Sequence, residues 1–236
     1  MRAMTETRNI VILTGAGISA ESGLRTFRAD DGLWEDHPVE QVATPEGFRR
    51  DPDLVQRFYD HRRVDVLAAM PNAAHMALAR LDAEWRGELL IVTQNIDDLH
   101  ERGGARRVLH MHGEALSVWC IVCDSRFRWE GTLRDGPPCP SCGAVAMRPD
   151  IVWFGELPYG METIYRALAN ADLFVSIGTS GAVYPAAGFV EEARRVGAQT
   201  LELNLEASLG SSSFDETRLG LASELVPQWV DQMLAE

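Results

Sequence analysis

Short apolar runs alternate with amphipathic segments along most of the chain. The apolar runs favour buried strands and lie at residues 9–13, 89–93, 173–177, 200–204 and 224–226. Apolar residues at helical spacing predict helices over residues 72–85, 161–170, 185–196 and 227–234. This alternation predicts an α/β fold with a doubly wound parallel sheet.

Two segments interrupt the alternation. Residues 35–70 have a largely helical pattern, including an expected helix from Pro52 to Ala69, and residues 115–150 contain all four cysteines. We interpret both segments as insertions that form a second, smaller domain. The larger domain is then predicted to consist of residues 1–34, 71–114 and 151–236.

Composition and charge narrow the class of protein. The 236 residues are 46% hydrophobic, which is enough for one substantial core. No apolar run approaches the length of a membrane span, and residues 1–8 lack the apolar stretch of a signal peptide, so we expect a cytoplasmic protein without a membrane partner. The net charge of −13 would repel a phosphate backbone and argues against nucleic acid as a partner.

A glycine-rich turn follows the first predicted strand. Gly15, Ala16, Gly17 and Ala20 form a GxGxxA pattern, which is typical of a dinucleotide-binding turn. In that interpretation Gly17 lets a pyrophosphate approach the backbone, and the small Ala20 lets the following helix pack close to the strand. A tight strand-to-helix turn without a ligand is the alternative. The polar residues 24–32 predict a long functional loop in place of a second strand, which disfavours a hydride-transferring dehydrogenase.

The cysteines form two pairs, Cys120-x-x-Cys123 and Cys139-x-x-Cys142, with 15 residues between them. This spacing can bring four thiolates into one tetrahedron and predicts a structural zinc site. Two disulfides are the alternative, which a reducing compartment disfavours. Because sulfur would fill all four positions, the metal would have no open position for a catalytic water.

Further polar motifs follow the carboxyl ends of the predicted strands, where open α/β sheets bind ligands. The motifs follow the glycine loop in a fixed order along the chain. They are the turn Gln-Asn-Ile-Asp at 94–97, His-Met-His-Gly-Glu at 110–114, the cysteine pairs and Val-Trp-Phe-Gly-Glu at 152–156. This ordered set resembles the sirtuins and covers almost the whole chain. The resemblance implies a Rossmann-like domain, a smaller zinc-binding and helical domain, and transfer of an acyl group from a lysine side chain to the ADP-ribose of NAD, with release of nicotinamide.

The resemblance also implies the ligands. NAD would be the co-substrate, one zinc per chain would be structural, acylated lysine side chains of proteins would be the partners, and we expect a monomer. The implied NAD-binding residues are Gly15, Ala16, Gly17, Phe27, Arg28, Trp34, Gln94, Asn95, Ile96, Asp97, Gly178, Thr179, Ser180, Asn204, Leu205, Glu206 and Ala222.

Some of these residues have specific implied roles. Asn95 and Asp97 would bind the nicotinamide end, with Asn95 supporting a water and the ribose as part of the catalytic machinery. Asp97 has the alternative role of a helix N-cap. Phe27 would shield the reactive anomeric carbon, or else anchor its loop in the core.

By the same resemblance, His112 is the general base that takes a proton from a ribose hydroxyl, since an imidazole titrates near neutral pH. His110 is the competitor, because residues two apart in an extended segment face the same side. Gly113, directly after His112, matches the family pattern and favours His112. A structural histidine is the alternative at either position.

The implied substrate site has two parts. Val152, Trp153, Phe154 and Gly155 resemble the segment that pairs with the substrate peptide and walls an apolar tunnel for the acyl-lysine, and an aromatic core strand is the alternative. Tyr59 and Arg62 share one helix face. They resemble the pair with which one sirtuin class recognises succinyl- and malonyl-lysine, whereas a solvated helix face is the alternative.

The sequence therefore predicts an NAD-dependent protein lysine deacylase that removes acetyl groups and also succinyl or malonyl groups. Mono-ADP-ribosyl transfer to protein from the same active site is the second hypothesis. A non-enzymatic zinc-ribbon binding module is the third, and the strong negative charge disfavours it.

Overall fold

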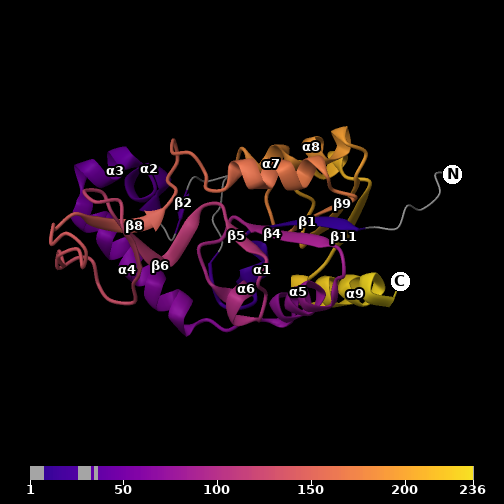
Figure 1. Ribbon diagram of the computed structural model, residues 1–236, viewed down its shortest axis with the longest axis horizontal. Coiled ribbons are helices and arrows are strands. Elements are labelled where there is room, and N and C mark those ends of the chain that lie inside the picture. The colour runs from indigo at the N-terminus through magenta and orange to yellow at the C-terminus, as the bar shows by residue number, and fades with distance from the viewer. Residues whose placement is uncertain (1–7, 26–32, 35–36, 236) are drawn as a thin grey trace.

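The computed structural model describes residues 8–25, 33–34 and 37–235. Its larger part is built on a six-stranded sheet with the strand order β11-β10-β9-β1-β4-β5 (Figure 1). The strands are β1 (Asn9–Thr14), β4 (Glu88–Thr93), β5 (Val108–His110), β9 (Leu173–Ile177), β10 (Gln199–Asn204) and β11 (Glu216–Leu219). Every neighbouring pair is parallel, which confirms the predicted doubly wound α/β fold.

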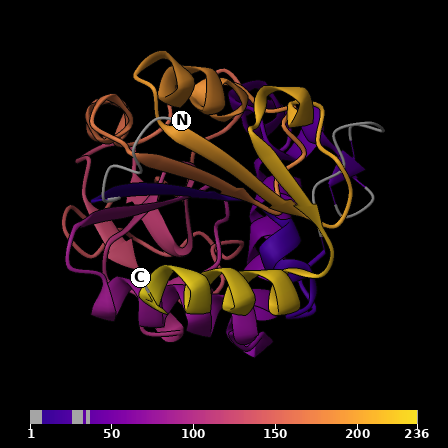
Figure 2. The same ribbon diagram turned by 90° about the vertical axis from the view of Figure 1, so that its right-hand side faces the viewer.

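Helices cover both faces of this sheet, as Figures 1 and 2 show. Ile10 and Ile12 of β1 join the core beneath α5 (Ala73–Glu84) and α9 (Ala222–Ala235). The intervening Val11 and Leu13 join the opposite core, beneath α7 (Met161–Ala169) and α8 (Phe189–Arg195). Because successive side chains of a strand point to opposite faces, a strand covered on both sides is apolar throughout, which explains the unbroken run at residues 9–13.

The two edge strands differ from the sequence prediction. The strand expected at residues 224–226 is wrong, since these residues lie within α9, and Pro227 lies inside that helix and not at its start. The sixth strand is β11, whose residues Glu-Thr-Arg-Leu are mostly exposed and carry no apolar signal. At the opposite edge, β5 is too short, at three residues, for periodicity to reveal it.

The helix expected after the glycine loop is a single turn, α1 (Gly17–Ala20). The chain leaves the helical conformation at Gly23, whose φ is +87°. Ala20 is exposed. The expectation that its small side chain allows close packing against the strand is therefore wrong.

The smaller part of the molecule combines two segments that are distant in sequence. One contributes the helices α2 (Val39–Val42), α3 (Pro45–Arg50) and α4 (Pro52–Ala68). The other is an antiparallel sheet of β7 (Arg126–Arg128), β6 (Gly113–Cys120) and β8 (Met147–Ile151). Val55 and Phe58 of α4 share one core with Leu116 of β6 and Ile151 of β8, which holds the two segments together.

The remaining described elements are short. They are β2 (Leu33–Trp34), paired with β3 (His37–Pro38), α6 (Leu99–Arg102) and the 3-10 turns η1 (Ala186–Gly188) and η2 (Ser211–Ser213). We expected no second strand between the glycine turn and residue 35. The short strand β2 differs from this expectation, although the two-residue ribbon β2–β3 is separate from the main sheet. The proposed domain boundaries stay predictions. In the part of the chain that the structure describes, no helix has the length and apolar character needed to cross a membrane.

Candidate functional site

A cleft of about 760 Å³ lies where the larger sheet meets the smaller part of the molecule. It brings together nearly all of the described residues that the sequence singled out. Those lining it are Gly15, Ala16, Gly17, Trp34, Tyr59, Arg62, Gln94, Asn95, Ile96, Asp97, His112, Val152, Trp153, Phe154, Gly155, Gly178, Thr179, Ser180, Asn204, Leu205 and Glu206.

Three of the residues predicted to bind NAD are not among this lining. Phe27 and Arg28 lie outside the described residues. Ala222 begins α9 and packs against the core beside α5, away from the cleft wall. Its expected contact near an adenine ring stays a prediction.

The glycines of the β1 and β9 loops are required because the two backbones touch. A Cβ added to Gly17 would lie 2.7 Å from the Cα of Gly178, and one added to Gly15 would lie 2.8 Å from the Gly178 carbonyl oxygen. Gly178 itself has φ +62°, and its own Cβ would meet the Ile18 nitrogen at 2.5 Å. Close loop packing, and not only the approach of a phosphate, therefore fixes these positions.

Ser19 connects the two polar residues expected at the nicotinamide end. Its hydroxyl donates to Asp97 Oδ2 over 3.0 Å and accepts from Asn95 Nδ2 over 3.1 Å. Asn95 also donates to the Gly15 carbonyl oxygen. The other Asp97 oxygen accepts from the Leu99 N–H, but the N-cap residue of α6 (Leu99–Arg102) is Asp98, so the helix N-cap alternative for Asp97 is wrong. Burial raises the pKa of Asp97.

Sequence reasoning did not single out Ser19 or its neighbour His75. The His75 Nδ1 accepts from the Asn72 N–H, so its Nε2 carries the proton and points toward the Ser19 hydroxyl at 3.4 Å. Burial lowers the pKa of His75 to about 4. Ser19 lies in α1, directly after the glycine turn, but His75 lies in α5 and only the fold brings it near.

The two histidines of the His-Met-His motif have different environments. His112 lines the cleft and donates from Nδ1 to the Gln94 carbonyl oxygen over 3.1 Å, which leaves the lone pair on Nε2. Burial lowers its pKa. His110 does not line the cleft, and both of its ring nitrogens face acceptors, the Asn95 carbonyl oxygen at 3.2 Å and Glu101 at 2.9 Å. Burial alone would lower the pKa of His110, but the bond to Glu101 raises it.

On the β9 side, two hydroxyls are held by the main chain. Thr179 Oγ1 accepts from the Gly181 N–H, and Ser180 Oγ accepts from the Ala182 N–H. Each hydroxyl therefore keeps its own hydrogen for donation into the cleft. The Asn204 amide donates to the Thr179 carbonyl oxygen over 2.8 Å and so fixes this loop to β10.

Helix α4 carries Tyr59 and Arg62 to the cleft. Their side chains are buried, at 1% and 5% exposure, so a solvated helix face is excluded. Arg62 Nη1 lies 3.6 Å from a carboxylate oxygen of Asp65 on the same helix. Arg62 also lies over the Trp34 ring at 5.8 Å. The adjacent Arg63 points elsewhere and donates to the carbonyl oxygens of Ala115 and Gly131.

Residues 152–155 follow the end of β8 and form part of the cleft wall. The Val152 N–H donates to the His112 carbonyl oxygen over 2.9 Å, and the Phe154 N–H donates to the Ala43 carbonyl oxygen over 2.9 Å. Trp153 is buried, whereas Phe154 is 46% exposed. The segment is therefore anchored to both parts of the molecule and is not an aromatic core strand.

The four cysteines form one cluster apart from the cleft, with all four Sγ atoms within 4.8 Å of one another. The Cys120–Cys142 and Cys123–Cys139 sulfurs are each 3.7 Å apart. Zn–S bonds of about 2.3 Å in a tetrahedron place sulfurs about 3.8 Å apart, whereas a disulfide needs about 2.05 Å. The donor set fits one structural zinc, and the alternative of two disulfides is excluded.

Comparisons with known proteins identify the family. The model of the Sir2 family matches residues 15–185. The NAD-dependent protein deacylase of Pasteurella multocida is 57% identical over 98% of this chain and 100% of its own length. The NAD-dependent protein deacylase of Yersinia pseudotuberculosis is 59% identical over 95% of this chain and 82% of its own length.

Solved structures give the same answer. The crystal structure of a Sir2 homologue with NAD has a TM-score of 0.89 and 37% identity, with 97% of this chain and 90% of that chain covered. A Sir2 protein bound to an acetylated peptide has a TM-score of 0.83 and 29% identity, with 96% and 94% covered. Fold, site and sequence agree, and this chain belongs to the Sir2 family.

Proposed function

We propose that this chain is an NAD-dependent protein lysine deacylase. The deacylase names of its relatives favour this activity over mono-ADP-ribosyl transfer. The observation that carries the proposal is the single cleft that contains the glycine loop, the Gln94–Asp97 turn, His112 and the Tyr59–Arg62 pair.

We assign the general base to His112. Its Nδ1–H is donated to the Gln94 carbonyl oxygen, so Nε2 carries no proton in the neutral ring, and His112 lines the cleft. Since burial lowers its pKa, the neutral form dominates at pH 7. The base would take the proton of a ribose hydroxyl. His110 suits this role poorly because both of its nitrogens are bonded to acceptors.

Bound NAD supplies the electrophilic ribose carbon that receives the acyl oxygen and releases nicotinamide. The chain's residues bind and orient it. Asp97 and Asn95, linked through Ser19, would hold the nicotinamide end, where the carboxylate can accept from the carboxamide NH2. The Thr179 and Ser180 hydroxyls would donate to phosphate or ribose oxygens, and Glu206, exposed at the cleft, would accept from the adenosine ribose.

We propose that the acyl group enters beside Trp153 and ends at Tyr59 and Arg62. The apolar wall suits the lysine stem and an acetyl group. The buried Arg62 guanidinium suits the distal carboxylate of a succinyl or malonyl group, because a guanidinium can bind a carboxylate bidentately. In this proposal zinc holds the fold of the smaller part and takes no part in the chemistry. A monomeric state and a cytoplasmic location stay predictions.

A panel of acyl-lysine peptides tests the function. Acetyl, malonyl, succinyl and longer acyl peptides of one sequence would be incubated with and without NAD, and deacylated peptide and nicotinamide would be quantified. We expect both products only with NAD and in equal amounts, with succinyl and malonyl peptides among the substrates. Absence of NAD-dependent product from every peptide would refute the proposal.

A further inference from the structure

The hydroxyl of Tyr59 has a defined hydrogen-bond direction. Trp153 Nε1 lies 3.0 Å from it, and an indole N–H can only donate. The phenol oxygen is therefore the acceptor in this bond, and its own hydrogen can point to another partner. Burial raises the pKa of Tyr59 far above its usual value, so the hydroxyl stays protonated. Tyr59 lines the cleft, where a ligand carboxylate could accept that hydrogen.

The Trp153 ring is in turn held by a buried arginine. The Arg148 guanidinium lies 3.5 Å from the centroid of the Trp153 ring and 5.1 Å from that of Trp119. Arg148 is 6% exposed, and Trp153 is 2% exposed. A buried guanidinium this close to the Trp153 ring restricts the tilt of that ring.

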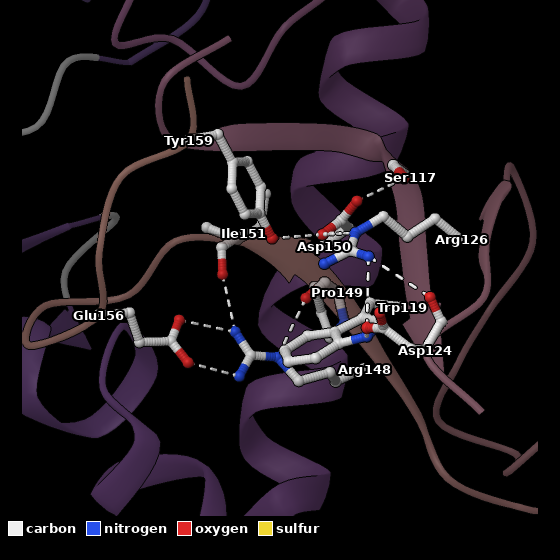
Figure 3. A network of polar contacts seen from close by, with 10 residues as sticks. All are labelled: Ser117, Trp119, Asp124, Arg126, Arg148, Pro149, Asp150, Ile151, Glu156 and Tyr159. Atoms are coloured by element: carbon white, nitrogen blue, oxygen red, sulfur yellow. Dashed lines mark hydrogen bonds and ion pairs between the residues drawn. The ribbon is translucent and has the colours of Figure 1, made fainter. Parts of the chain in front are cut away.

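Glu156 fixes the arginine in this place, as Figure 3 shows. Its two oxygens accept from Arg148 Nη1 at 2.8 Å and Nη2 at 2.9 Å. Arg148 Nη2 also donates to the Ile151 carbonyl oxygen at 2.7 Å. Glu156 Oε2 accepts from the Trp153 main-chain N–H at 2.9 Å, so the same carboxylate holds both the guanidinium and the backbone of Trp153.

We infer that Arg148 and Glu156 are positioning residues for acyl selectivity. They hold Trp153 as the donor to Tyr59, which directs the Tyr59 hydroxyl hydrogen toward the distal carboxylate of an acidic acyl group. This inference rests on the proposed acyl site at Tyr59 and Arg62. It assigns selectivity to Arg148 of β8 and to Glu156 in the loop that follows, which act through Trp153.

The variant Trp153→Phe tests the inference because it keeps an aromatic ring and removes the indole N–H. We expect the ratio of succinyl to acetyl kcat/KM to fall about 3- to 10-fold, the worth of one neutral hydrogen bond, through KM for the succinyl peptide. Arg148→Lys, which loses the planar stacked fork, should shift the ratio in the same direction. Thermal unfolding of each variant identifies any that fail to fold. If Arg148→Lys fails to fold, the result for Trp153→Phe alone decides the inference.

A double-mutant cycle separates this role from a merely structural one. In a Tyr59→Phe background, Trp153→Phe should leave the succinyl-to-acetyl ratio unchanged within twofold, since the hydroxyl it directs is gone. An equal fall in both backgrounds would overturn the inference. So would an unchanged ratio in Trp153→Phe alone.

The matched control is Arg126→Lys. Arg126 stacks on the outer side of the network, 5.0 Å from the Trp119 ring, and its side chain is 40% exposed. This variant should not alter the ratio, and a fall equal to that of Arg148→Lys would count against the inference. Calorimetric Kd values for the two peptides provide the same ratio without turnover. If the wild type showed no turnover of any peptide, the proposed function would be refuted. The ratio of the Kd values for the succinyl and acetyl peptides would still decide the inference.

Discussion

His112 donates its Nδ1–H to the main-chain oxygen of Gln94 over 3.1 Å, and this one bond determines which ring nitrogen can act as a base. The neighbouring main-chain oxygen, of Asn95, accepts from His110. The turn at residues 94–97 thus orients both rings while it presents Asn95 and Asp97 to the cleft. The binding turn and the base are therefore positioned by the same short stretch of backbone.

Replacement of His112 by alanine should abolish turnover and leave the fold intact, because the ring makes one hydrogen bond to the main chain and none to another described side chain. Loss of a general base costs roughly 10²–10⁴-fold in rate. Steady-state deacylation and thermal unfolding of the same preparation check both statements. His110→Gln is the control, with a smaller loss expected, and an equal loss in the two variants would contradict the assignment.

Arg62→Met should lower kcat/KM for a succinyl peptide by roughly 10- to 100-fold and spare an acetyl peptide, because a hydrogen bond to a charged group is worth roughly 1.5–3 kcal/mol. Arg63 is unsuitable as the control, although the sequence suggests it, since its buried guanidinium holds Ala115 and Gly131. Arg57→Met is the matched control, on the exposed face of the same helix. Equal losses on both peptides would show that Arg62 does not bind the carboxylate.

Cys120→Ser or Cys142→Ser should release zinc and lower stability before NAD chemistry is affected directly, since a closed tetrathiolate site contributes folding energy. Elemental analysis should find one zinc per wild-type chain and less than one in either variant. The control is Ser125→Ala, which lies near the cluster but supplies no sulfur ligand. This variant should retain the metal. If wild-type protein purified under reducing conditions contained no zinc, that result would contradict the predicted zinc site.

The protein should lose stability as the pH falls from 6.5 toward 4. Burial lowers the pKa of His75 to about 4 and that of His100 well below 6.5, so the unfolded chain binds more protons than the folded one in this range. His75 alone should cost about 2 kcal/mol between pH 6.5 and 5, at about 1.4 kcal/mol per pH unit. His110, whose pKa is raised, opposes part of this loss.

Urea unfolding at pH 7 and pH 5 measures the difference. A protein that is equally stable at the two pH values would contradict the neutral state assigned to the buried histidines.

The sequence predicted the features that arise from local pattern. Strands buried on both faces, such as β1, are unbroken apolar runs, and the cysteine spacing identified the metal cluster. Features decided by tertiary contacts were missed. The edge strand β11 is polar because most of its side chains are exposed. Pro227 suggested the start of a helix, but it lies inside α9, which begins at Ala222.

The site shows the same division. The glycine loop, the Gln94–Asp97 turn and the Tyr59–Arg62 pair could be read from motifs and spacing. The difference between His110 and His112 could not, because it depends on which carbonyl oxygen and which carboxylate face each ring. His75 lies 56 residues from Ser19 in the sequence, so only the fold brings them together. Arg148 is close to Trp153 in the sequence, but no local pattern predicts that its guanidinium stacks on that ring.

In the proposed reaction the acyl group leaves the lysine and ends on free ADP-ribose. NAD labelled in its ADP-ribose moiety, incubated with an acetyl- or succinyl-lysine protein, tests this transfer. The label should appear in free O-acyl-ADP-ribose, in amounts equal to the deacylated lysine and the released nicotinamide. Label that remains covalently attached to the protein, with the acyl-lysine intact, would contradict it and establish ADP-ribosyl transfer instead.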